Sequence, residues 1–190
     1  MMLKRLVLLA AFSVITRNCV AAGQRNSWWA DKTLISRLSP AQSVDGFAIR
    51  PPRGYTIVRS GGADDVKIVA WIGSAHSDVV RPSVMMALVP VSKTNNRTLP
   101  QILGKFLQGI QKRRQNWKRT GTETGQINGI RFVRARWSGT DTATKIPLRG
   151  FNYVGIIGNK VVQLSSQDVK THFDALRVAE TSVLTFRKLP

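Results

Sequence analysis

The sequence contains two blocks of strand-forming segments separated by one strongly amphipathic helix, and this order limits the fold more than any other feature. Thr98 followed by Gln101, with Pro100 between them, is the pattern of a capping box at a helix start. Apolar side chains then recur at helical spacing: Ile102, Leu103, Phe106, Leu107 and Ile110. We therefore expect a helix over residues 99–116 that buries Leu103, Phe106 and Ile110 against a sheet.

Runs of β-branched and apolar residues, bounded by turn residues, lie on both sides of this helix. The expected strands before it are 47–50, 55–59, 66–72 and 83–91, and those after it are 119–126, 130–138, 148–157 and 161–165. A second helix is expected over 171–183. Because short turns such as Asn128-Gly129 join the strands, the sheet should be antiparallel. The predicted fold class is α+β, with a central antiparallel sheet flanked by helices in an α/β/α sandwich.

The first 22 residues have the three parts of an export signal. Lys4 and Arg5 precede an apolar stretch of ten residues, 6–15, and small side chains follow at Val20 and Ala22. Ten apolar residues are too few for a transmembrane helix, which needs about 20. We expect a signal peptide at 1–22, cleaved near Ala22, a leader at 23–43, a domain at 44–188 and a secreted or periplasmic protein without a membrane span. A retained anchor is the alternative.

The chain is strongly basic, with 29 Lys and Arg against 10 Asp and Glu and a net charge of +19. This imbalance favours anionic partners, and the sign of the charge alone does not distinguish among them. The export signal argues against nucleic acid, which leaves an anionic surface or an acidic protein. The sole cysteine, Cys19, belongs to the expected signal, so the mature domain should have neither a disulfide nor a thiolate ligand.

The basic residues are concentrated where acids are absent. No acid occurs between Asp78 and Glu123, and the basic pattern continues on the segment around Phe132, where alternation places Arg134 and Arg136 on one face. The candidate anion-binding or partner-binding residues are Lys105, Lys112, Arg113, Arg114, Lys118, Arg119, Arg134 and Arg136. Surfaces that only confer solubility usually mix both signs, so this pattern indicates a binding surface.

The chain has two histidines, His76 and His172. Residues 73–78 (GSAHSD) place a serine, a histidine and an aspartate in one segment, but this segment lacks the strand-turn-helix context of a nucleophile elbow. As metal ligands, His76 and Asp78 have no third partner nearby in sequence, and His172 is expected to be solvent-exposed in the first turn of a helix. We therefore predict no catalytic residue, no cofactor and no metal.

Three short motifs, in order, resemble the PsbP-like superfamily: residues 46–49 (GFAI) with 52–55 (PRGY), then 128–132 (NGIRF), then 182–186 (SVLTF). The superfamily includes the extrinsic oxygen-evolving subunit of photosystem II and exported bacterial domains, and the fold is similar to that of a Ran-binding nuclear import factor. The resemblance covers about residues 44–188 and implies a central antiparallel sheet with helices on both faces. It implies no catalytic residue.

Two functions follow as hypotheses. The first is an exported, non-catalytic binding or accessory module whose basic surface holds an anionic envelope component or an acidic partner protein. The alternative is an extracytoplasmic enzyme of unrecognised type that uses the loop around His76.

Overall fold

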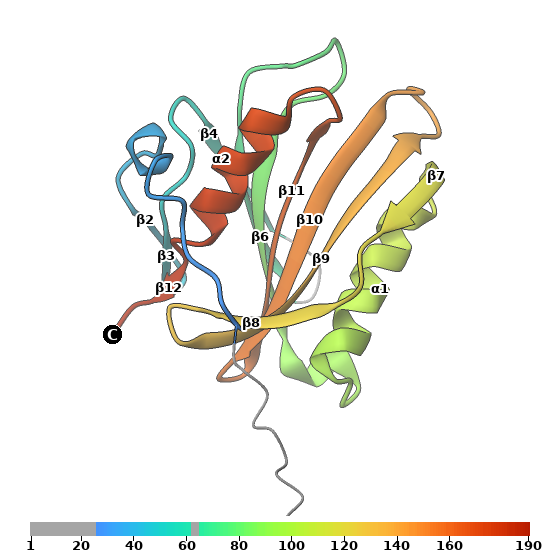
Figure 1. Cartoon of the computed structure of the whole chain (residues 1–190). Coiled ribbons are helices and arrows are strands. Elements are labelled where there is room, and N and C mark those ends of the chain that lie inside the picture. Colours follow the sequence, from blue (N-terminus) through green and yellow to red (C-terminus); the bar gives the residue numbers. More distant parts are fainter. Residues whose placement is uncertain (1–25, 62–64) are drawn as a thin grey trace, which may run out of the picture.

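The computed structural model describes residues 26–61 and 65–190 (Figure 1). The predicted signal peptide at 1–22 and the first residues of the leader lie outside this part of the chain. No helix within it is long and apolar enough to span a membrane.

Within the described residues, nine strands form one large sheet. Its order is β1 (Asn26–Ser27), β8 (Glu123–Ile127), β9 (Ile130–Asp141), β10 (Pro147–Ile157), β11 (Lys160–Val169), β6 (Ser83–Pro90), β5 (Lys67–Ile72) and β4 (Thr56–Gly61), and β7 (Arg114–Arg119) also pairs with β9. All pairings are antiparallel except that of β1 with β8. A smaller sheet has the order β12 (Arg187–Lys188), β3 (Phe47–Ile49), β2 (Gln42–Val44).

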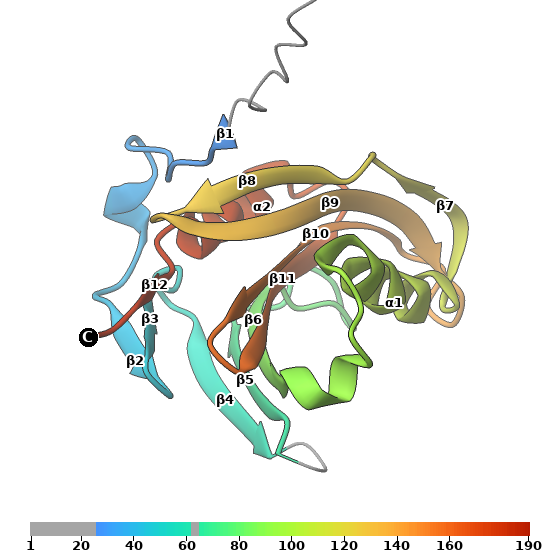
Figure 2. The ribbon, with the colours of Figure 1, turned by 90° about the horizontal axis from the view of Figure 1, so that it is seen from below.

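Two helices cover opposite faces of the large sheet, α1 (Leu99–Gln111) and α2 (Phe173–Val183), and two short 3₁₀ helices, η1 (Ile35–Arg37) and η2 (Val91–Thr94), lie in loops. The sheet curves around α1, as Figure 2 shows. Strand β9 separates the two cores by alternation, since Phe132 packs in the core with α2 whereas Val133 and Ala135 pack in the core with α1. The predicted α+β sandwich is therefore confirmed.

Helix α1 begins as predicted but is shorter than predicted. The capping box at Thr98 and Gln101 is present, and Leu103 is fully buried. Phe106 and Ile110 are only partly buried, because Ile102 and Leu107 share the buried face with Leu103.

The helix ends at Gln111 rather than near residue 116 because the next residues form strand β7. Asn116 adopts a left-handed backbone conformation (φ 50°) at an irregularity in the pairing of β7 with β9. Trp117 then stacks on Trp137 of β9, with ring centroids 5.4 Å apart. Sheet pairing and this aromatic contact outweigh the local helical tendency.

Candidate anion-binding site

The eight predicted basic residues do not form one surface. Lys105, Lys112 and Arg113 are exposed on α1 and at its C-terminal end, on the concave side of the sheet. Lys118 and Arg119 are exposed on β7. The other three residues, Arg114, Arg134 and Arg136, form ion pairs with carboxylates.

Arg114 is buried, contrary to the prediction that it belongs to a basic binding surface. Its side chain is 5% exposed and forms an ion pair with Asp141, and its guanidinium lies 5.8 Å from the ring of Trp137. Burial lowers the pKa of Arg114, and the negative charge of Asp141 partly opposes this shift. Arg114 joins β7 to the end of β9 and is a structural residue.

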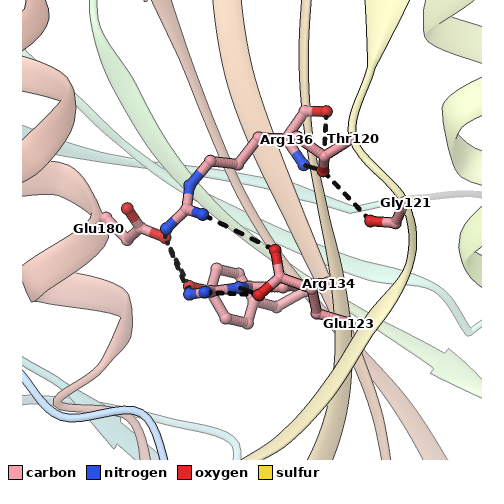
Figure 3. Close-up of polar contacts among 7 residues, drawn as sticks. Thr120, Gly121, Glu123, Arg134, Arg136 and Glu180 are labelled. Atoms are coloured by element: carbon pink, nitrogen blue, oxygen red, sulfur yellow. Dashed lines mark hydrogen bonds and ion pairs between the residues drawn. The ribbon is translucent and has the colours of Figure 1, made fainter.

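Arg134 and Arg136 lie on the predicted face of β9, but they are not free cations (Figure 3). Glu180 of α2 accepts hydrogen bonds from Arg136 (2.8 Å) and from the hydroxyl of Tyr153 (2.6 Å). Glu123 of β8 lies 2.8 Å from Arg134 Nη2. Burial, reinforced by the charge of Glu180, raises the pKa of Tyr153. Two carboxylates thus largely neutralise the two arginines, and the cluster fastens α2 to the sheet.

A groove of about 580 Å³ lies between α2 and strands β7, β9 and β10. The register of strand pairing determines which side chains form the floor of this groove. Directly paired residues form a row across four strands, Lys118, Ser138, Arg149 and Asp168, and all of them face α2. A second row, two residues along, contains Arg136 and Phe151. Cross-strand pairing therefore brings together cations that are far apart in sequence.

Six cations line this groove: Lys118, Arg119, Arg136, Arg149, Lys170 and Arg177. Among the described residues that line the groove, Glu180 is the one acid, and it is already bound to Arg134 and Arg136. Arg177 pairs with Asp31 at 2.9 Å. Within the described residues, Lys118, Arg119, Arg149 and Lys170 form no ion pair, so four uncompensated cations face one groove.

Arg149 stands at the apolar wall of the groove. Its guanidinium lies 5.1 Å from the ring centroid of Phe173, and Phe173 is 56% exposed. The Nε atom of Arg149 is buried without a hydrogen-bond partner in the structure. Such a donor is costly to bury unpaired. Phe151 and Leu176 complete the apolar part of the lining.

A second cluster lies at the beginning of α2. His76 Nδ1 is 2.7 Å from Asp168 Oδ2, and the rings of His76 and His172 meet edge to face with centroids 4.1 Å apart. The partner of His76 is thus Asp168, far away in sequence, and not Asp78, which is exposed in the same loop. His172 is the N-cap residue of α2 and partly buried, with a buried Nδ1, so the expectation of a solvent-exposed side chain is wrong.

The sequence matches no protein-family model and no curated protein sequence. Among solved structures, cyanobacterial PsbP (CyanoP) from Synechocystis is 15% identical, with a TM-score of 0.56, and the match covers 81% of this chain and 94% of that one. LpqN of Mycobacterium tuberculosis, involved in cell envelope biogenesis, is 10% identical with a TM-score of 0.56, covering 86% and 99%. The chain has a PsbP-like fold. The Ran-binding protein Mog1p of Saccharomyces cerevisiae shares it, at 10% identity, a TM-score of 0.54 and coverage of 80% and 96%.

The PsbP-like fold agrees with the resemblance inferred from the sequence motifs, and the motifs have structural roles in it. Phe186 stacks on Phe47 (5.3 Å) and meets Phe132 edge to face (5.8 Å), so one aromatic residue from each of the three motifs joins a single core. At these identities the likeness defines the fold and no more.

Sequence reasoning found Lys118, Arg119 and Arg136 but missed the rest of the groove. Arg149, Lys170 and Arg177 lie outside both the acid-free segment, which drew attention to Lys118 and Arg119, and the basic segment around Phe132, which contains Arg136. One signal was available, because alternation along 147–157 places Arg149 on the same face as Phe151. The groove depends on the pairing of β10 with β9 and β11, and local sequence does not specify that pairing.

Proposed function

We propose that this protein is an extracytoplasmic, non-catalytic binding or accessory module, and that the groove between α2 and β7, β9 and β10 holds an anionic group of an envelope component or of an acidic partner protein. The observation that carries the proposal is the convergence of four uncompensated cations, Lys118, Arg119, Arg149 and Lys170, on one groove. The exposed ring of Phe173 beside them favours a ligand that combines an anionic group with an apolar portion.

The export part of the proposal rests on residues 1–22. A basic start, an apolar stretch of ten residues and small side chains at Val20 and Ala22 support cleavage by a signal peptidase. Sequencing the N-terminus of the protein recovered from its native host tests this. A start within a few residues of Gly23 supports export, and an intact Met1 on a cytosolic protein contradicts it.

Two charge-matched triple variants test the groove. One reverses Lys118, Arg119 and Lys170 to Glu, and the other reverses Lys105, Lys112 and Arg113 to Glu. All six side chains are exposed, so both variants should fold, and each replaces two lysines and one arginine. Arg114 is excluded because its reversal would place a second carboxylate against Asp141 in a buried site.

Retention on phosphatidylglycerol vesicles, on heparin and on envelope extract is compared across a salt series. We expect the groove variant to lose retention on at least one of these and the α1 variant to keep most of it. Retention of the wild type should weaken with salt, because the Debye length falls from about 10 Å at 0.1 M to about 3 Å at 1 M. Equal losses in both variants would mean that net charge, and not the groove, determines binding.

One contact favours the alternative function, an enzyme that uses His76. The bond between His76 and the buried Asp168 is the arrangement that orients a general base. Ser77 in the same loop instead accepts a hydrogen bond from the N–H of Val80. Hydrolysis of chromogenic ester or phosphate substrates that is lost in His76→Ala would support this alternative.

A further inference from the structure

The chain contains only two histidines, and the fold brings both to one buried carboxylate. His76 comes from the loop between β5 and β6, Asp168 from the end of β11, and His172 from the N-cap position of α2. One potential ligand atom from each residue lies within 4.8 Å of the others. Side chains from three separate elements thus lie close enough together to hold a single metal ion.

Among the described residues, His76 is the one ion-pair partner of Asp168. The side chain is 1% exposed, and Oδ1 accepts a hydrogen bond from the N–H of Val169 (2.7 Å). Arg149 lies directly opposite Asp168 in the sheet but contacts Phe173 and forms no ion pair with the carboxylate. A buried carboxylate requires a compensating positive charge. His76 is positioned either to carry that charge itself or to help bind a metal cation that carries it.

The protein alone does not satisfy all the hydrogen-bonding groups of the second histidine, His172. His172 Nδ1 is buried and has no hydrogen-bond partner within residues 26–61 and 65–190, although neutral imidazole has one donor and one acceptor nitrogen to satisfy. Two imidazoles beside a carboxylate are a usual composition of a transition-metal site.

We propose that His76, Asp168 and His172 form a three-ligand site for a divalent transition metal of the zinc class. Imidazole and carboxylate ligands suit zinc, and three protein ligands leave a fourth position for water or another group. Two ligands of a tetrahedral zinc ion lie about 3.3 Å apart, so the 2.7 Å pair of His76 and Asp168 must open by roughly half an ångström as the metal replaces the proton between them.

The site has a route to solvent. The His76 side chain is 26% exposed and lines a cavity of about 390 Å³ together with Tyr55, Arg37 and Arg53. Burial raises the pKa of Tyr55 to about 12, and the negative charge of Asp168 contributes to the shift. Tyr55 therefore remains protonated and does not compete with the three ligands as a phenolate.

Metal titration of the purified protein, without a polyhistidine tag and after dialysis against a chelator, tests the proposal. We expect one equivalent of Zn²⁺ or Co²⁺ to bind, Co²⁺ to give visible d–d absorption, and Mg²⁺ not to compete, because imidazole is a poor ligand for it. With only two histidines, both sets of imidazole signals in the proton NMR spectrum should respond to Zn²⁺ together.

Removing a ligand should weaken binding by at least about 100-fold. His172→Gln is the preferred variant because it lies at a helix end, and His76→Ala is the second, so that a folding defect in one leaves the other informative. Asp78→Asn, an exposed change two residues from His76, is the matched control and should bind as the wild type does. No stoichiometric binding by the folded wild type, or unchanged affinity in both histidine variants, would overturn the proposal.

Discussion

Arg149 and Asp168 face each other across β10 and β11, yet they do not form an ion pair. The guanidinium of Arg149 packs on Phe173 in the basic groove, whereas the carboxylate of Asp168 binds His76. One pair of opposed residues thus separates two candidate sites, a cationic groove for anions and a carboxylate with two histidines. If Arg149 paired with Asp168, the groove would lose one of its four unpaired cations, and the negative charge beside the two histidines would be neutralised.

The first prediction concerns Arg149 itself. Replacing it by Gln removes the cation and its buried donor, so the affinity for a groove-bound anion should fall about tenfold, the value of one charge-assisted hydrogen bond. Arg187→Gln, an exposed arginine on β12, is the control and should have no effect. The measurement is retention on anionic vesicles at fixed salt, and equal retention of both variants would argue against a role for Arg149.

Glu180→Gln should change binding and stability in opposite directions. Loss of the carboxylate removes the closer of the two ion-pair partners of Arg136 and leaves Glu123 at 3.8 Å, so anion binding in the groove should become stronger. The same change removes one partner of Arg134, which is 13% exposed, and should cost about 1–3 kcal/mol of unfolding free energy. Denaturant unfolding and vesicle retention measure the two effects. Weaker binding in a folded variant would show that Glu180 itself takes part in ligand contact.

Asp141 should stabilise the fold in a pH-dependent way. Its pKa lies below the usual value because the N–H of Thr144 donates to it (3.0 Å), with further contributions from Ala143 and Arg114. Since the folded-state pKa is below the unfolded-state value of about 3.9, the stabilisation is complete above about pH 5 and is lost as the pH falls through the folded-state pKa.

At pH 7, Asp141→Asn leaves the buried Arg114 without its ion-pair partner and should cost about 3 kcal/mol. The difference between wild type and variant, measured by urea unfolding across a pH series, should shrink below pH 4. A difference that stays constant down to pH 2 would mean that the carboxylate charge is not its source.

Two glycine substitutions should have opposite effects. A Cβ at Gly150 would lie 2.4 Å from the carbonyl oxygen of Ser166 and 2.6 Å from the ring of Trp137, so Gly150→Ala should displace a groove-lining strand and destabilise the domain by several kcal/mol. Gly109 lies on the exposed side of α1 with open space around it, and Gly109→Ala should stabilise by about 0.5–1 kcal/mol. Thermal unfolding of both variants decides the question, and similar melting temperatures would contradict the packing described for β10.

The sequence by itself determined the alternation of elements, the start of α1 and the face of β9 on which Arg134 and Arg136 lie. These features depend on neighbours three or four residues apart, such as Thr98 and Gln101, or on the two-residue repeat of a strand. The order of the core motifs was also sufficient to predict the fold that the structure confirms.

Only the tertiary structure decided which charges remain free. Helix α1 stops at Gln111 because β7 pairs with β9, and this buries Arg114 beside Asp141. Glu180 neutralises Arg136 from a helix 44 residues away in the chain. Likewise, His76 meets Asp168 across 92 residues. Ion pairing and ligand geometry depend on distances of a few ångströms between distant segments, and strand register, which local sequence does not specify, determines those distances.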